Sequence, residues 1–172
     1  GGSLWSGEDP VRLPFERGPI HHEAEMVLSV GRHLDHATAV EARAAVDGVA
    51  VGLDLTLREL QAGLKALGLP WLVAKSFANA AIVSTFAPLP PERDLQALDL
   101  RLIIGGTVRQ HASTSLTIWS AAELLSLLSA RVPVLPGDIV FTGTPEGVGP
   151  LGPGDRVELT LSDLARLELT VA

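Results

Sequence analysis

Hydrophobic and polar positions alternate over short stretches of this chain, a pattern typical of strands more than of helices. The alternation is clearest at 20–31, and an apolar run rich in β-branched residues follows at 49–55. Gly105 and Gly106 interrupt another strand-like stretch, which predicts a hairpin. Strand patterns also fill the C-terminal part of the chain, at 138–143, 155–161 and 164–172.

Three stretches have a helical pattern instead, at 35–48, 57–68 and 121–132. The first is predicted to end at Gly48. Thr56 with Glu59 and Ser120 with Glu123 have capping-box spacing at the starts of the other two, and Gly68 and Pro70 are stop signals after the second. The intervening stretch 71–77 is predicted to be extended.

Strands and helices do not alternate as βαβ units along this sequence, which indicates an α+β fold with a predominantly β core. A length of 172 residues with 47% hydrophobic residues fits one domain with a substantial core. We expect residues 1–20 to form an N-terminal loop and residues 21–172 to form the catalytic domain.

Charge and composition limit the kinds of molecule that this protein is expected to bind. A formal net charge of −7 and a pI near 5.1 argue against nucleic acid or an anionic membrane surface as a partner, since both require a concentrated basic patch. No apolar run approaches the roughly 20 residues that span a bilayer. The absence of cysteine agrees with a cytoplasmic location, which we expect.

Three acidic residues are candidates for a metal site. Glu23 and Glu25, two positions apart on one predicted strand, share a face, and carboxylate oxygens suit Mg²⁺, Mn²⁺ or Ca²⁺. A solvated strand face would give the same pattern. Asp54 ends an apolar run, where a buried carboxylate needs a partner or a metal, although capping of the following helix is an equal alternative.

Other polar residues are candidates for contact with an anionic substrate. Arg58 and Gln61 lie one helical turn apart, and both could bind a carboxylate, although surface exposure explains them as well. Lys75 could stabilise an enolate or simply lie on an exposed edge. Thr144 belongs to the glycine- and proline-rich stretch 137–155, which is long for a hairpin loop and suits close approach of backbone to a ligand.

Four motifs together resemble the fumarylacetoacetate hydrolase family, in the family's order across residues 20–171. They are HHEAE, GLDLTLREL, PWLVAKSF and GDIVFTGTPEGVGPL. Within the family, the chain looks most like the acylpyruvases and oxaloacetate decarboxylases and the decarboxylase/isomerase enzymes of aromatic catabolism.

This resemblance implies a mixed β-sandwich roll that is usually dimeric, with Glu23, Glu25 and Asp54 holding Mg²⁺ or Mn²⁺. It implies that Lys75 is catalytic and that Arg58, Gln61, Lys75 and Thr144 bind a small 2-oxo acid. The expected activity is cleavage of a carbon–carbon bond in an acylpyruvate-type substrate, and the alternative is decarboxylation or isomerisation of a 2-oxo dicarboxylate.

Family members of this group carry a preceding lid with a His-x-x-Glu pair that activates water, whereas this sequence begins after that segment. A lid-less, non-catalytic scaffold that binds a metal or a ligand is therefore a second hypothesis.

Overall fold

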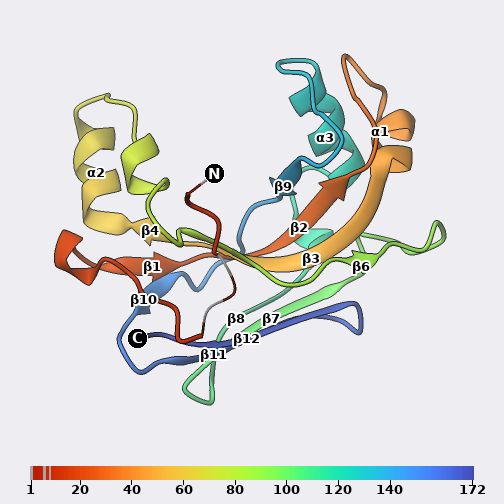
Figure 1. Cartoon of the computed structure of the whole chain (residues 1–172). Coiled ribbons are helices and arrows are strands. Elements are labelled where there is room, and N and C mark those ends of the chain that lie inside the picture. The colour runs from red at the N-terminus through yellow and green to blue at the C-terminus, as the bar shows by residue number, and fades with distance from the viewer. Residues whose placement is uncertain (1, 6, 8) are drawn as a thin grey trace.

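Two curved antiparallel sheets form most of the computed structural model, which describes residues 2–5, 7 and 9–172 (Figure 1). The first sheet has the strand order β5-β3-β2-β9, with β6 also paired to β3. Its strands are β2 (Ala24–Val30), β3 (Val46–Asp54), β5 (Ala81–Val83), β6 (Ala87–Pro88) and β9 (Ile139–Phe141). The second has the order β12-β11-β7-β8 and comprises β7 (Asp99–Ile104), β8 (Thr107–Ser113), β11 (Arg156–Leu161) and β12 (Ala165–Thr170).

The two sheets pack against each other and bury the core between them. Leu28 and Leu53 of the first sheet and Leu102 and Leu159 of the second are fully buried members of one apolar cluster. Strands β7 and β11 alternate buried and exposed residues, as half-buried strands do, whereas β3 is buried along most of its length. The predicted α+β, predominantly β architecture is confirmed.

A small third sheet joins distant parts of the chain at one end of the first. It has the order β10-β1-β4, from β1 (Ile20–His22), β4 (Thr56–Leu57) and β10 (Gly149–Leu151). The predicted strand over 20–31 is therefore divided into β1 and β2 at Glu23, which lies between them. This division allows the chain to leave one sheet and enter another.

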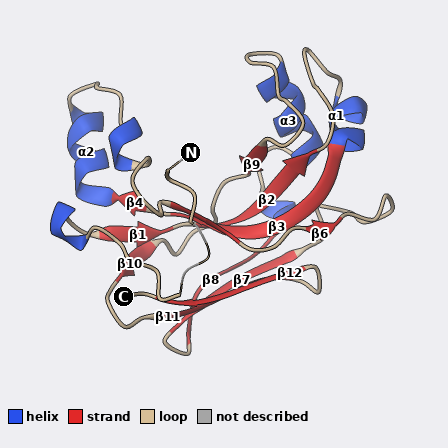
Figure 2. Cartoon of the chain, in the orientation of Figure 1, coloured by secondary structure: helices blue, strands red, loops and turns tan. Residues whose placement is uncertain are grey.

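The helices lie at the two ends of the first sheet, α2 at one end and α1 with α3 at the other (Figure 2). They are α1 (Ala39–Ala45), α2 (Arg58–Ala66) and α3 (Ala121–Ser129), and short 3₁₀ turns occur at η1 (Phe15–Arg17), η2 (Leu72–Ala74) and η3 (Thr114–Leu116). In the part of the chain that the structure describes, no helix combines the length and the apolar character needed to cross a membrane.

Several local predictions are confirmed. The hairpin joining β7 and β8 turns at Gly105 and Gly106, both with positive φ. Ser120 and Glu123 form the predicted capping box of α3, and Gly68, at φ +66°, follows the end of α2.

Three local predictions are wrong. Thr56 does not cap α2: it lies in β4, and the helix starts after Leu57 without a side-chain cap. Helix α1 ends at Ala45 instead of Gly48 because the following residues pair with β2 as β3. The stretch before Lys75 is the 3₁₀ turn η2 and not an extended segment.

Candidate metal centre

The three acidic residues singled out in the sequence meet at the edge where β1, β2 and β3 come together. Each of Glu23, Glu25 and Asp54 offers a carboxylate oxygen, and these oxygens lie within 4.8 Å of one another. Glu23 comes from the break between β1 and β2, Glu25 from β2, and Asp54 from the end of β3.

Backbone pairing fixes this convergence. The Asp54 N–H donates to the Glu23 carbonyl at 2.9 Å, which binds the two segments together. Glu25 faces Gly52 across the β2–β3 ladder, and a Cβ at Gly52 would lie 2.8 Å from the Val27 side chain. The absence of a side chain at Gly52 therefore lets β3 pack closely beside the Glu25 strand.

Two cations face the carboxylates. The Lys75 ammonium donates to Glu23 at 2.7 Å and to Asp54 at 2.6 Å. Arg58 donates to Glu23, and its other terminal nitrogen donates to the Gln61 side-chain oxygen at 2.7 Å. Arg58 and Gln61 thus interact as their helical spacing predicts, and neither Lys75 nor Asp54 is a solvated edge residue or a helix cap.

Unequal surroundings give the three carboxylates different acidities. Burial raises the pKa of Glu25 to about 7, and the nearby Asp54 and Glu23 charges add to this rise against a stabilising Gly143 N–H bond. Burial also raises the pKa of Asp54, although the Lys75 hydrogen bond opposes it. Burial acts on Glu23 as well, but hydrogen bonds from Lys75 and Arg58 outweigh it and lower the pKa of Glu23.

The glycine-rich loop after β9 runs beside the start of β2. The Gly143 N–H donates to Glu25 at 2.6 Å, and the Thr144 hydroxyl donates to the Ala24 carbonyl at 2.8 Å. Thr142 is tied to the Met26 carbonyl through both its N–H and its hydroxyl. The loop therefore follows β2 residue by residue, and Thr144 lies close to the acidic cluster, as expected.

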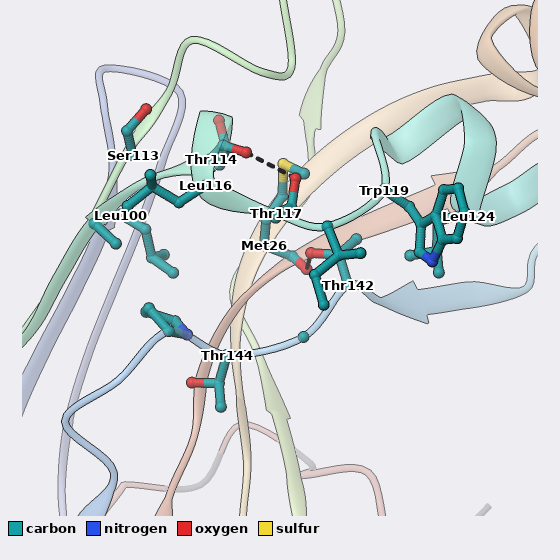
Figure 3. Close-up of a pocket in the computed structure, with 14 residues that line it drawn as sticks. Met26, Leu100, Ser113, Thr114, Leu116, Thr117, Trp119, Leu124, Thr142 and Thr144 are labelled. Carbon is teal, nitrogen blue, oxygen red and sulfur yellow. Dashed lines mark hydrogen bonds between the residues drawn. The ribbon is translucent and has the colours of Figure 1, made fainter.

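Beyond this loop lies a pocket of about 420 Å³ with a mostly apolar lining (Figure 3). Gly143 and Thr144 belong to its wall, but none of the three carboxylates does. Met26, which lines the pocket, directly follows Glu25 on the strand, so their side chains point to opposite faces. The pocket is thus a separate space that shares one loop with the acidic cluster.

The donor set fits a hard divalent cation. Three carboxylates carry three negative charges when ionised, and Lys75 and Arg58 balance only two of them. Carboxylate oxygens are the ligands that Mg²⁺ and Mn²⁺ prefer, and Glu25, with 4% of its surface exposed, gains from a partner of opposite charge.

Comparison with known proteins identifies the family of this chain. The family model described as "Fumarylacetoacetate (FAA) hydrolase C-terminal" matches residues 2–172. The chain belongs to the fumarylacetoacetate hydrolase family.

Relatives in this family are named enzymes. Oxaloacetate tautomerase YcgM of Escherichia coli (strain K12) is 39% identical over 152 residues, which cover 88% of this chain and 69% of the relative. Fumarylpyruvate hydrolase from Pseudomonas aeruginosa, solved in complex with Mn²⁺ and pyruvate, is 33% identical with a TM-score of 0.91 over 98% of this chain and 72% of that chain.

A third relative is 5-carboxymethyl-2-hydroxymuconate delta-isomerase from Mycobacterium smegmatis. It is 30% identical with a TM-score of 0.88 over 99% of this chain and 66% of that chain. The protein is therefore an enzyme of this family.

Two contacts of the site were not found by sequence reasoning. One is the Gly143 N–H, which no side-chain pattern can indicate. The other is Gln110, a buried residue of β8 that donates to Thr144 at 2.8 Å. Gln110 lies in a polar strand sequence, TVRQHAS, in which nothing distinguishes it from its exposed neighbours.

Proposed function

We propose that this protein binds a divalent cation through Glu23, Glu25 and Asp54 and transforms a small 2-oxo acid by way of its enolate. The convergence of three carboxylate oxygens within 4.8 Å, with the Lys75 ammonium beside two of the carboxylates, carries this proposal. Mn²⁺ is the first ion to test because the Pseudomonas relative was solved with it, and Mg²⁺ offers the same chemistry.

The proposed roles follow from charge. A bound cation would act as a Lewis acid toward the substrate carbonyl. Lys75 would stabilise the negative charge that develops on the carbonyl oxygen, and Arg58 with Gln61 would bind the substrate carboxylate. Thr144 would meet the same anionic end from the loop.

Keto–enol tautomerisation of oxaloacetate is the reaction that we place first. It removes a proton from carbon and returns a proton to oxygen without consuming water, so it requires a group that carries this proton and groups that stabilise the enolate between the two transfers. The Escherichia coli relative, at 39% identity, bears this activity in its name.

Hydrolysis of a carbon–carbon bond in an acylpyruvate, the activity placed first from the sequence, is the second candidate. The similarity to fumarylpyruvate hydrolase, at a TM-score of 0.91, favours it. Hydrolysis also releases an enolate, but it does so by breaking a carbon–carbon bond after water has added, so it requires a base that activates water. Decarboxylation of a 2-oxo dicarboxylate forms its enolate by losing CO₂, and isomerisation forms it by losing a proton from carbon.

The test is Glu23→Ala, with Glu168→Ala as its control. Glu168 is an exposed glutamate of β12, so its removal changes the net charge equally and leaves the acidic cluster intact. We expect Glu23→Ala to abolish Mn²⁺ binding by calorimetry and the enolisation of oxaloacetate followed by ultraviolet absorbance, whereas Glu168→Ala retains both. Undiminished binding and turnover in folded Glu23→Ala would refute the proposal.

Assembly as a homodimer and a cytoplasmic location stay predictions. Exposed apolar side chains around η3 support a surface that a second subunit covers, since Leu116 is 76% and Ile118 is 91% exposed. Sedimentation equilibrium is expected to give twice the monomer mass.

A further inference from the structure

Gln110 joins three separate segments next to the acidic cluster. Its side-chain oxygen accepts the Ala24 N–H at 3.0 Å and contacts His22 Nδ1 at 2.9 Å. Its side-chain nitrogen donates to the Thr144 hydroxyl at 2.8 Å and to the Pro145 carbonyl at 2.9 Å. With 1% of its surface exposed, Gln110 thus uses every hydrogen-bonding site of its amide inside the protein.

An irregularity in β8 directs this side chain inward. The β7–β8 register shifts between Leu102 and Ile103, so that Leu102 faces Gln110 while Ile103 faces Val108, and Arg109 is the extra residue. Gln110 is the only residue of β8 that is buried. The bulge therefore delivers one polar side chain from the second sheet to the site on the first.

The orientation of the Gln110 amide is determined by its partners. The Ala24 N–H can only donate and the Pro145 carbonyl can only accept, so the amide oxygen must face Ala24 and the amide nitrogen must face Pro145. Ala24 lies between Glu23 and Glu25. Gln110 thus fixes the distance between the acidic strand and the loop.

This network determines what Thr144 can offer a ligand. Its hydroxyl accepts from Gln110 and donates its single proton to the Ala24 carbonyl. The hydroxyl therefore has no proton left for an anion. The Thr144 N–H, in contrast, has no acceptor among residues 2–5, 7 and 9–172, and it follows the Gly143 N–H that binds Glu25.

We propose that Gln110 is a positioning residue of the active site, which orients the Thr144 hydroxyl and thereby presents the Thr144 main-chain N–H to the carboxylate of the substrate. This inference rests on the proposed function, because it assigns the contact made by the anionic end of the same 2-oxo acid. Gln110 itself does not touch the substrate.

A merely structural Gln110 predicts a different result. Gln110 contacts the loop and the Ala24 main chain but none of the three carboxylates. Loss of a positioning residue should therefore weaken anion binding while cation binding is preserved, whereas general destabilisation weakens both.

The experiment measures Mn²⁺ affinity and then oxalate affinity of the Mn²⁺-loaded protein by calorimetry. Oxalate is used as a stable dianion that resembles the enolate of a 2-oxo acid. The variants are Gln110→Met, which keeps the length of the side chain, Thr144→Val, which keeps its shape, and the double variant. Ser129→Ala, which removes a buried hydroxyl near the end of α3, controls for lost stability.

We expect both single variants to weaken oxalate binding about tenfold, the usual effect of one disturbed hydrogen bond to a charged group. Mn²⁺ affinity should change by less than about twofold. The double variant should be no weaker than the weaker single variant, because both changes break the same network. Thr144→Ser should restore binding, and Ser129→Ala should leave both affinities unchanged.

Three results would overturn the inference. They are unchanged oxalate affinity in either folded single variant, additive losses in the double variant, and a parallel loss of Mn²⁺ and oxalate binding. Thr144→Val addresses the question even if Gln110→Met does not fold, because Thr144 lies in a partly exposed loop. Failure of the wild-type protein to bind Mn²⁺ would instead contradict the proposed function.

Discussion

At the scale of single residues, the site concentrates negative charge that the protein only partly neutralises. Glu23 receives both cations, Asp54 receives one, and Glu25 receives only the Gly143 N–H. Glu25 is also the most buried of the three, and this burial raises its pKa to about 7. Because of this unequal pairing, Glu25 is the carboxylate that would gain most from a bound cation.

Glu25→Gln is expected to stabilise the metal-free protein at high pH. The folded-state pKa of Glu25, about 7, lies above its ordinary value of 4.5, so the folded protein holds this proton more tightly than the unfolded chain does. Wild-type stability should therefore fall as pH rises from 4.5 to 7, and the variant avoids that loss.

In EDTA at pH 8, urea denaturation should give Glu25→Gln an advantage of about 3 kcal/mol, which vanishes near pH 4.5. An advantage that is independent of pH would contradict this explanation.

Lys75→Met is expected to separate catalysis from metal binding. Removing the ammonium deletes the charge proposed to stabilise the enolate, so turnover of oxaloacetate should fall by about 100-fold or more. Mn²⁺ affinity should hold or increase, because Glu23 and Asp54 lose a competing cation.

Lys65→Met, at an exposed position of α2, is the matched control and should retain both properties. Wild-type turnover in Lys75→Met would exclude a catalytic role for Lys75.

At the scale of elements, the loop between β9 and β10 explains why this part of the chain is rich in glycine. Gly147 has φ +96°, and a Cβ there would lie 2.3 Å from the Arg109 carbonyl in the β8 bulge. Close approach of the loop to that bulge is what brings Pro145 and Thr144 within reach of Gln110. Gly147 thus allows both the turn of the loop and its close contact with the β8 bulge.

Gly147→Ala is expected to destabilise the protein by about 2 kcal/mol or more, since a side chain there is strained by the backbone and also meets the Arg109 carbonyl. Gly63→Ala is the control, because Gly63 lies in α2, where a Cβ meets nothing within 4 Å. This substitution should stabilise the protein by about 1 kcal/mol. Equal effects of the two substitutions in thermal denaturation would show that Gly147 is not required by its backbone conformation and its contact with Arg109.

At the scale of the whole molecule, the acidic cluster unites segments that are distant in sequence. Glu23 lies between β1 and β2, Glu25 lies in β2, Asp54 ends β3, and Lys75 follows η2. Because the three carboxylates converge only in the folded state, a cation bound there would stabilise folding as a whole.

Saturating Mn²⁺ is therefore expected to raise the melting temperature. At about 100 times its dissociation constant, the ion adds about 2.7 kcal/mol, which corresponds to roughly 5–10 °C for a chain of this size. Differential scanning fluorimetry should record the shift, and excess EDTA should reverse it. An unchanged melting temperature at saturating Mn²⁺ would contradict specific binding by the folded protein.

Local patterns predicted most of the architecture but failed where tertiary pairing competes. The capping box of α3 and the Gly105–Gly106 hairpin depend on adjacent residues and were predicted correctly. Thr56 has the same capping pattern as Ser120, yet it lies in a strand instead, because its backbone pairs with β1 from an earlier part of the chain. A pattern of four residues contains no information about that strand.

Residue patterns along the chain were enough to select the candidate site residues. Burying a carboxylate or a lysine among apolar residues costs free energy that only a paired group or a ligand offsets. Such residues can be recognised in the sequence from their apolar neighbours. The folded chain alone reveals which groups meet: Lys75 bridges Glu23 and Asp54, and Gln110 from another sheet holds Thr144. Those contacts depend on strand order and on a one-residue bulge, which arise from packing across the whole molecule.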